Sequence, residues 1–262
     1  MKRRLLIAAS VLLLAGLSGF YGMQHVRNGD VPTGKASSAA RGATANQKPS
    51  VKKEIFNKSQ HSLDDPASPW AVINKRRPLR PVEYVPATLT VPAVPLRSNI
   101  TGDERQLTAT AAAALESLVN GAKAEGIQLT MQSGYRSYNF QMNLYNRYVR
   151  QQGQDVADTQ SARPGHSEHQ TGLAADVGGI SNPACNVEPC FADTAEGKWV
   201  ADNAHTYGFI IRYPLNKAAV TGYIYEPWHL RYVGVELAGE IRRQSGVTME
   251  ELFSLPPAPD YN

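Results

Sequence analysis

The folded part of this sequence lacks an excess of positive charge. Residues 61–262 hold 17 Lys and Arg against 21 Asp and Glu, a net charge of −4, whereas residues 1–60 hold 10 against 2, a net charge of +8. Phosphate neutralisation supplies most of the non-specific affinity for nucleic acids, so a nucleic-acid binder would carry its basic residues on the folded body. The charge distribution therefore excludes a nucleic-acid partner.

Long apolar runs are scarce as well, because the chain has only one, at its amino terminus. A polytopic membrane protein is excluded, since it would need several such runs. Charged residues make up 19% of the sequence and hydrophobic residues 42%, with 21 Gly and 17 Pro. This composition fits neither a coiled coil nor a wholly disordered chain. It favours one leader followed by one globular domain.

The single apolar run follows three positive charges. Residues 2–4 are Lys-Arg-Arg, and residues 5–23 are nearly uncharged and contain LLIAASVLLLAGL. This order is typical of an export signal, and at about 1.5 Å per helical residue the run is also long enough to span the hydrocarbon core. We expect residues 1–25 to be a signal anchor or a cleaved signal peptide, which places the protein outside the cytoplasm, on the membrane or secreted.

The rest of the chain divides by composition. Residues 26–65 are small, polar and basic, which predicts a disordered basic linker, either solvated or in contact with anionic wall polymers or lipid headgroups. Residues 66–255 have the composition of a folded domain, and residues 256–262 form a C-terminal tail. Helical and strand patterns mix in this domain without regular βαβ alternation. We therefore expect an α+β fold with a small, largely antiparallel sheet flanked by helices.

Both cysteines, Cys185 and Cys190, lie five positions apart. In an exported chain the surroundings are oxidising, which favours a disulfide that closes this small loop. The same spacing is that of half a zinc site, but the sequence contains no second half. A disulfide is the expected state of the pair.

Local patterns predict the main elements of the domain. Thr101 and Glu104 form a capping-box pattern, which predicts a helix from Thr101 to Gly126. Ser137 is placed to cap a second helix that runs to about residue 151. Strands are predicted at residues 127–131, 173–177 and 209–213, and further helices at residues 196–207 and 235–244.

Histidines and carboxylates approach one another in the second half of the sequence. His169 precedes Asp176 by seven residues, and Glu226 precedes His229 by three. A catalytic zinc ion takes three N or O ligands from the protein and keeps a fourth position for water. His169, Asp176 and His229 supply this number, and Glu226 remains as a base for the bound water.

Spacing alone leaves the metal site open. Single His and Asp residues in globular domains are more often hydrogen-bonded polar groups than ligands. In a regular strand, Glu226 and His229 would face opposite sides. Pro227 cannot donate to a strand ladder and must interrupt this alternation if both side chains are to reach one ion.

Four stretches occur in order along the chain: SGYRSYNFQMNLY (133–145), SEHQTGLAAD (167–176), YGFIIRYP (207–214) and TGYIYEPWHLRYVG (221–234). Together they resemble the VanY-type D-alanyl-D-alanine carboxypeptidases. These are zinc peptidases of bacterial cell-wall metabolism, related in fold to lysostaphin-type peptidases and the hedgehog signalling domain. The resemblance covers roughly residues 66–240 and implies the same fold.

The resemblance implies a role for each matching residue. One Zn²⁺ per chain would be held by His169, Asp176 and His229, and Glu226 would be the general base. Arg136, in the SGYRS stretch, would hold the carbonyl oxygen of the scissile bond. Two further positions match residues that grip the terminal carboxylate of the substrate in related enzymes, Gln141 and Ser167.

The implied activity is removal of the C-terminal D-alanine from peptidoglycan stem peptides by a monomeric enzyme of the bacterial cell wall. An L,D-carboxypeptidase that acts on tetrapeptide stems has the same metal ligands and is the nearest alternative. A non-catalytic zinc-stabilised module that binds cell-wall peptides is a second alternative, although it would not need Glu226 as a base. A phage-type endopeptidase fits the leader less well.

Overall fold

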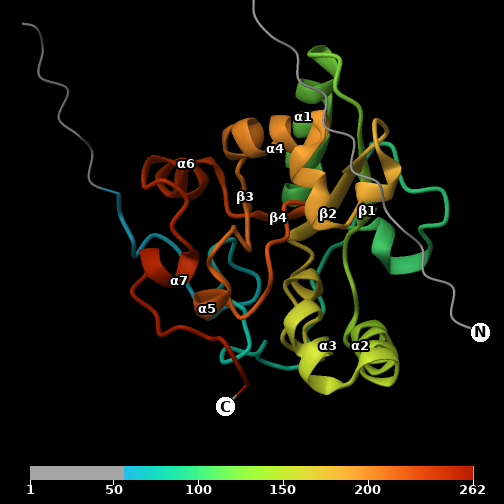
Figure 1. Ribbon diagram of the computed structural model, residues 1–262. Coiled ribbons are helices and arrows are strands. Elements are labelled where there is room, and N and C mark those ends of the chain that lie inside the picture. Colours follow the sequence, from blue (N-terminus) through green and yellow to red (C-terminus); the bar gives the residue numbers. More distant parts are fainter. Residues whose placement is uncertain (1–55, 262) are drawn as a thin grey trace, which may run out of the picture. The chain divides into compact units, whose positions relative to one another are not determined.

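The structure, a computed structural model, describes residues 56–261 and is built around one small sheet (Figure 1). All neighbouring strands pair antiparallel, in the order β1-β2-β4-β3. The four strands are β1 (Leu129–Ser133), β2 (Ala174–Gly179), β3 (Phe209–Ile211) and β4 (His229–Tyr232). The antiparallel sheet and its flanking helices confirm the predicted α+β fold class.

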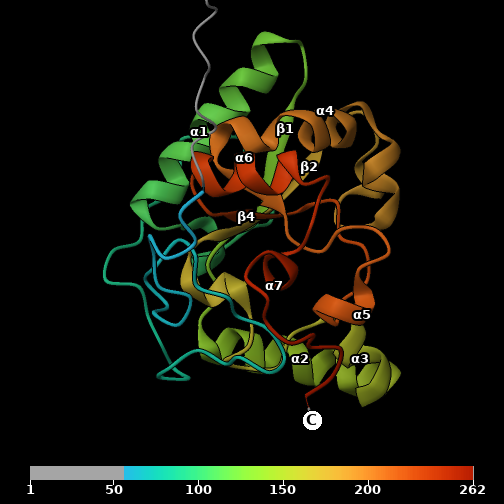
Figure 2. The same cartoon turned by 90° about the vertical axis from the view of Figure 1, so that its left-hand side faces the viewer.

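Helices flank the sheet on both sides. Figures 1 and 2 show α1 and α4 on one side and α2 with α3 on the other. The α-helices are α1 (Ala109–Ala124), α2 (Tyr138–Gln152), α3 (Gln154–Gln160), α4 (Ala195–Asn203), α5 (Ala218–Thr221), α6 (Val235–Arg243) and α7 (Met249–Leu252). Short 3-10 helices are η1 (Gly102–Arg105), η2 (Glu168–Thr171), η3 (Pro183–Cys185), η4 (Pro189–Asp193) and η5 (Ala204–Tyr207).

The two faces of the sheet have different surroundings. Ala175, Val177 and Leu230 point into an apolar core that they share with α1 and α4. Side chains alternate along a strand, so Asp176 and His229 point to the opposite face. The central strands therefore hold the molecule together with one face and present polar groups with the other.

A second apolar cluster joins the segment before the first helix to α6 and α7. Trp70 is buried, and its indole N–H donates to the carbonyl of Val233 at 3.0 Å. Phe56 stacks on Trp70 with ring centroids 5.3 Å apart, and Leu63 packs against the same cluster. Residues 56–65, which we assigned to the linker, thus pack on the domain because they carry these two large apolar side chains.

The end of the chain also packs on the domain. Ala258 is buried, and the guanidinium of Arg163 lies 4.1 Å from the ring centroid of Tyr261. The predicted signal segment and residues 26–55 of the predicted linker lie outside the described residues. Among residues 56–261, no helix has the length and the apolar character that crossing a membrane requires.

The helix predicted from Thr101 begins later than the capping-box pattern indicated. Thr101 makes no side-chain cap hydrogen bond, and only one 3-10 turn, η1, follows it. Leu107 and Thr90 then exchange backbone hydrogen bonds of 2.8 and 2.9 Å. This pairing holds the chain extended between η1 and α1. Helix α1 starts after Thr108, whose hydroxyl caps it by accepting from the N–H of Ala111.

Candidate active site

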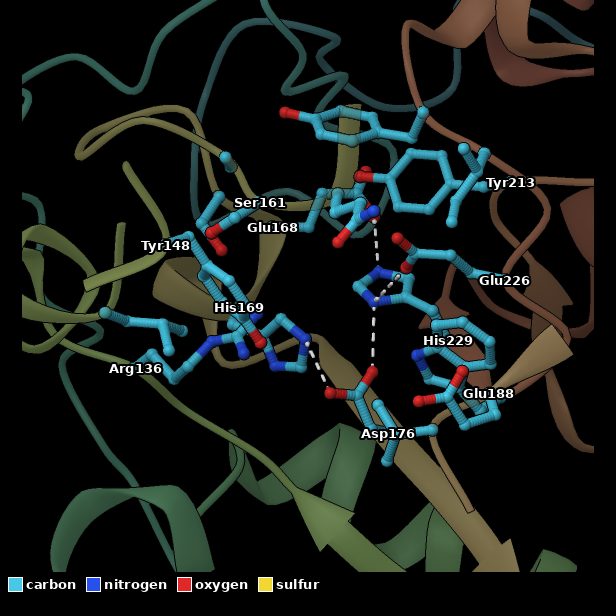
Figure 3. Close-up of a pocket in the computed structure, with 18 of the residues that line it drawn as sticks. Arg136, Tyr148, Ser161, Glu168, His169, Asp176, Glu188, Tyr213, Glu226 and His229 are labelled. Atoms are coloured by element: carbon cyan, nitrogen blue, oxygen red, sulfur yellow. Dashed lines mark hydrogen bonds and ion pairs between the residues drawn. The ribbon is translucent and has the colours of Figure 1, made fainter. Parts of the chain in front are cut away.

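Two strands and one 3-10 turn bring the three ligand candidates together. Asp176 on β2 and His229 on β4 are directly opposed in the antiparallel register, and His169 lies in η2, just before β2. His169 Nε2 is 3.3 Å from Asp176 Oδ2, and His229 Nδ1 is 3.2 Å from Asp176 Oδ1 (Figure 3). One ligand atom from each of the three buried side chains lies within 4.8 Å of the others.

Hydrogen bonds leave one nitrogen of each imidazole facing Asp176. His169 Nδ1 donates to the carbonyl oxygen of Gly134 at 2.6 Å, and its buried Nε2 has no hydrogen-bond partner among the described residues. His229 directs Nε2 toward Glu168 Oε2 at 3.5 Å and Nδ1 toward Asp176. This donor set fits Zn²⁺. It consists of the buried Nε2 of His169, the imidazole of His229, which a carboxylate orients, and the carboxylate of Asp176.

The electrostatics of the three groups are coupled. Burial and the nearby Arg136 lower the pKa of His169 to about 4. Burial alone would lower the pKa of His229 as well, but its hydrogen bonds to Asp176 and Glu168 outweigh that effect and raise it to about 9. Burial opposes the charge of Asp176, yet the two imidazoles hold its pKa well below its usual range.

Glu226 lies beside these groups because the chain turns at Pro227. Residues 227 and 228 form a turn, in which the N–H of His229 donates to the carbonyl of Glu226 at 3.2 Å. The Glu226 carboxylate is 3.9 Å from His229 Nδ1. Without a metal, burial raises the pKa of Glu226 to about 8, and a zinc cation beside it would favour the ionised form that acts as a general base. The predicted break at Pro227 is present, but residues 223–226 form no strand, and β4 begins only at His229.

The ligand candidates lie in the wall of a cavity of about 470 Å³. Of the residues predicted to bind substrate, Arg136 and Ser167 line this cavity. The buried Nε of Arg136 has no hydrogen-bond partner among the described residues, so this side chain has a donor available for a substrate oxygen. Figure 3 shows Arg136 beside His169.

Gln141 does not line the cavity but lies behind its wall. It is completely buried, and its Nε2 donates to the carbonyl of Ala162 at 2.7 Å and to Ser161 Oγ at 3.3 Å. Ser161 and Ala162 themselves line the cavity. Gln141 therefore supports the wall, and the neighbouring polar residues Gln160 and Ser161 line the cavity there.

A buried charge cluster, which the sequence motifs did not predict, lies beside the ligand candidates. We use this name for Glu168, Arg212, Arg231 and Glu250, which are all inaccessible to solvent or nearly so. Glu168 Oε1 accepts from Arg212 Nε at 2.8 Å and from Arg231 Nη1 at 2.7 Å. Burial opposes the charge of Glu168, but the two guanidinium groups hold its pKa well below its usual range.

The buried charge cluster extends from the site to distant parts of the chain. Arg212 also pairs with Glu250 of α7 at 2.6 Å, and Arg231 donates to the carbonyl of Ala71 at 2.9 Å. Glu168 uses its other oxygen to face His229. The orientation of one ligand candidate thus depends on residues near both ends of the folded domain. The signal available in the sequence was an arginine between apolar strand residues, in FIIRY and in HLRYV.

The predicted disulfide between Cys185 and Cys190 is present. The loop that it closes reaches the cavity, where Val187, Glu188 and Pro189 form part of the wall. The sequence patterns gave no reason to place this loop at the site, because it lies outside the stretches that carry the family resemblance.

Comparisons with known proteins agree with the geometry. The family described as "VanY: D-alanyl-D-alanine carboxypeptidase" matches residues 104–235. YodJ of Bacillus subtilis (strain 168) is 39% identical over 224 residues, which cover 84% of this chain and 81% of YodJ.

Two solved structures are similar over most of the domain. The LdcB LD-carboxypeptidase is 44% identical with a TM-score of 0.68, over 72% of this chain and 87% of LdcB. A mutant of the vancomycin-resistance D,D-pentapeptidase VanY in complex with Zn(II) is 30% identical with a TM-score of 0.57, over 71% of this chain and 98% of that one. The site, the family match and these structures lead to one conclusion: the chain belongs to the VanY carboxypeptidase family.

Proposed function

We propose that this protein is a zinc-dependent carboxypeptidase that removes the C-terminal D-alanine from peptidoglycan stem peptides. The observation that supports this most is the convergence of His169, Asp176 and His229, with Glu226 beside them, in the wall of the cavity. A purely structural zinc site is closed by protein ligands, whereas three ligands and a neighbouring base are the arrangement of a hydrolytic site.

The residues divide the hydrolysis among them. A zinc ion held by His169, Asp176 and His229 would supply a bound water with a pKa near 7 and polarise the scissile carbonyl. Glu226 accepts the proton of the attacking water and passes it to the leaving amine. Arg136 donates a hydrogen bond to the carbonyl oxygen, where negative charge develops in the transition state.

Charge explains why the enzyme acts on chain ends. Zn²⁺ with ionised Asp176 leaves a net charge of +1, ionised Glu226 reduces it to zero, and Arg136 restores +1. The terminal carboxylate of a peptide is therefore attracted to the Arg136 side of the cavity, where Ser167 offers a further donor. A charge-assisted hydrogen bond is worth about 1.5 to 3 kcal/mol, which favours chain ends over internal bonds by tenfold or more.

The residue before the scissile bond distinguishes two candidate activities. The sequence motifs predict a D,D-carboxypeptidase, which cleaves D-Ala-D-Ala at the end of pentapeptide stems. An L,D-carboxypeptidase, which acts on tetrapeptide stems, is supported by the greater similarity to LdcB, at 44% identity, than to VanY, at 30%. Both activities use the same proposed zinc ligands and base.

The decisive experiment combines metal analysis with mass spectrometry. We expect the purified protein to contain one zinc ion per chain and to release D-alanine from at least one of the two stems. Glu226→Gln should retain zinc and lose activity by a factor of 100 or more, because general-base catalysis contributes about 10² to 10⁴. A protein that binds stem peptides without releasing D-alanine, or a Glu226→Gln variant as active as the parent, would support the binding module instead.

The site of action follows from the substrate. We propose that the protein works outside the cytoplasm, with residues 1–25 as its export signal or membrane anchor and the rest of the segment before residue 56 as a tether. Cell fractionation of the full chain, with residues 2–4 replaced by Ser as the comparison, tests this. Export that is unaffected by that replacement would contradict it.

A further inference from the structure

The disulfide-closed loop (residues 185–190) forms one wall of the cavity. Val187, Glu188 and Pro189 line the cavity, so a carboxylate stands between two apolar surfaces. Glu188 is exposed, and its backbone N–H donates to the carbonyl of Cys185 at 3.2 Å within the loop. The Glu188 carboxylate is thus presented to the cavity by a short loop that the disulfide closes.

The loop is held at a fixed place relative to the proposed metal ligands. The side chain of Asn186 accepts from the N–H of Gly179 at 2.8 Å and donates to its carbonyl at 3.1 Å. Gly179 ends β2, the strand that carries Asp176. The approach is close, because a Cβ at Gly178 would lie 2.5 Å from Asn186 Oδ1. Glu188 is therefore positioned from the same strand as Asp176.

The charge of Glu188 is not compensated by any residue between 56 and 261. Three other carboxylates line the cavity, and each has a cationic or imidazole neighbour. Glu168 contacts the two arginines, Asp176 contacts the two histidines, and Glu226 lies beside His229. Within residues 56–261, no ion pair or side-chain hydrogen bond involves the Glu188 carboxylate, which also makes no helix-cap bond. A negative group without a partner at the edge of a substrate cavity is available to a cation.

Glu188 and Arg136 lie on opposite sides of the three ligand candidates in Figure 3. The proposed function places the leaving D-alanine, with its carboxylate, on the Arg136 side. The part of the substrate on the amino side of the scissile bond then extends toward the loop. Val187 and Pro189 suit an aliphatic chain, and Glu188 suits an ammonium group at its tip.

We propose that Glu188 is a specificity-determining residue that binds the cationic side chain of the substrate residue directly before the scissile bond. This inference rests on the proposed function and deepens it. A lysine-type residue stands directly before the terminal D-alanine in a tetrapeptide stem, whereas D-alanine stands there in a pentapeptide. The loop therefore selects the tetrapeptide.

The test compares four peptides: a tetrapeptide and a pentapeptide stem with L-lysine as the third residue, each with the lysine ε-amine free or acetylated. We expect the parent enzyme to cleave the tetrapeptide with the free amine roughly two to five times faster, by kcat/KM, than its acetylated form, as an exposed ion pair allows. Glu188→Gln should abolish this preference, and Glu188→Lys should reverse it. High salt should reduce it in the parent.

Glu125→Gln is the matched control, because Glu125 is exposed after α1 and does not line the cavity. It should keep the parent's preference. Three results would each overturn the inference but leave the proposed function standing. They are equal rates of the parent on free and acetylated tetrapeptide, an unchanged preference in Glu188→Gln, and cleavage of the pentapeptides alone. Failure of the parent to cleave any of the four peptides would overturn the proposed function, and the inference with it.

Discussion

The wall behind the proposed zinc ligands and the loop in front of them carry negative charge in opposite ways. Glu168, in the buried charge cluster, is 1% exposed and bonded to two arginines, whereas Glu188, on the disulfide-closed loop, is exposed and pairs with none of the residues that the structure describes. Both side chains line the same cavity. They differ in what surrounds them rather than in chemistry.

The difference shows how burial assigns roles to identical groups. A buried charge must be paired, because its desolvation costs several kcal/mol, and pairing commits it to a structural role. A charge at the edge of a cavity remains hydrated and contributes little to folding, so it is available to a ligand. We therefore expect substitutions behind the ligands to change stability and metal affinity, and substitutions in front of them to change substrate choice.

Glu168→Gln should have the largest effect on stability. It leaves Arg212 and Arg231 short of a buried counter-charge, and breaking a buried pair in this way costs about 3 to 5 kcal/mol. Urea unfolding of the metal-free variant measures the loss. Loss of the carboxylate that orients His229 should also weaken zinc binding by about 10 to 100-fold, as measured by competition with a chelator.

Glu125→Gln serves as the control here too, and it should leave both quantities unchanged. A Glu168→Gln variant that binds zinc as tightly as the parent would show that His229 does not depend on the buried charge cluster.

The metal site should respond to pH through His229. In the metal-free protein its pKa of about 9 exceeds the ordinary value of 6.5, so its contribution to stability is complete below pH 6.5 and disappears as the pH rises through 9. Zinc must displace the same proton, so its apparent affinity should increase about tenfold per pH unit up to pH 9. Zinc titrations in buffers of different ionisation enthalpy measure the released proton, and none released at pH 7 would contradict this assignment.

Removing the disulfide should have a smaller effect. Cys185→Ser combined with Cys190→Ser opens a loop of six residues, and the chain-entropy argument gives about 2 kcal/mol of lost stability for a ring of this size. Thermal unfolding with and without reductant tests the same bond in the parent. Zinc affinity should be unaffected, because Asp176 is also held by strand pairing. A reductant-dependent loss of zinc would contradict that separation.

Glu188→Gln should change stability least, by no more than about 0.5 kcal/mol, because the side chain is exposed and bonds to no other described residue. Urea unfolding beside Glu168→Gln gives the direct comparison between the two carboxylates. A loss of 2 kcal/mol or more would mean that the front carboxylate also has a structural role.

Local signals predicted the start of one helix and the end of another. Ser137 caps α2 by accepting from the N–H of Phe140, and α4 with η5 ends at Gly208, whose φ of 82° favours glycine. Both features depend on neighbours in sequence, so a pattern can reveal them. The pattern at Thr101 was misleading because pairing with Thr90, a non-local partner, holds the following chain extended.

The candidate site was predicted in part. Motifs predicted His169, Asp176, Glu226 and His229, because zinc hydrolysis needs these residue types and the family motifs contain them in this order. They did not identify Glu168 or Glu188, whose roles arise from partners far along the chain or from the fold of a loop. Gln141 was predicted to contact substrate, but in the structure it lies behind Ser161 and Ala162, because packing of the whole fold decides which side chain reaches the cavity.

The direct opposition of Asp176 and His229 across β2 and β4 has a consequence for refolding. A shift of β4 by a single position would turn the imidazole of His229 into the apolar core and bring Leu230 to the polar face. Under the proposed function, tight zinc uptake would report that these two strands have found their native alignment, and a misaligned chain would be recognised by its failure to retain the ion.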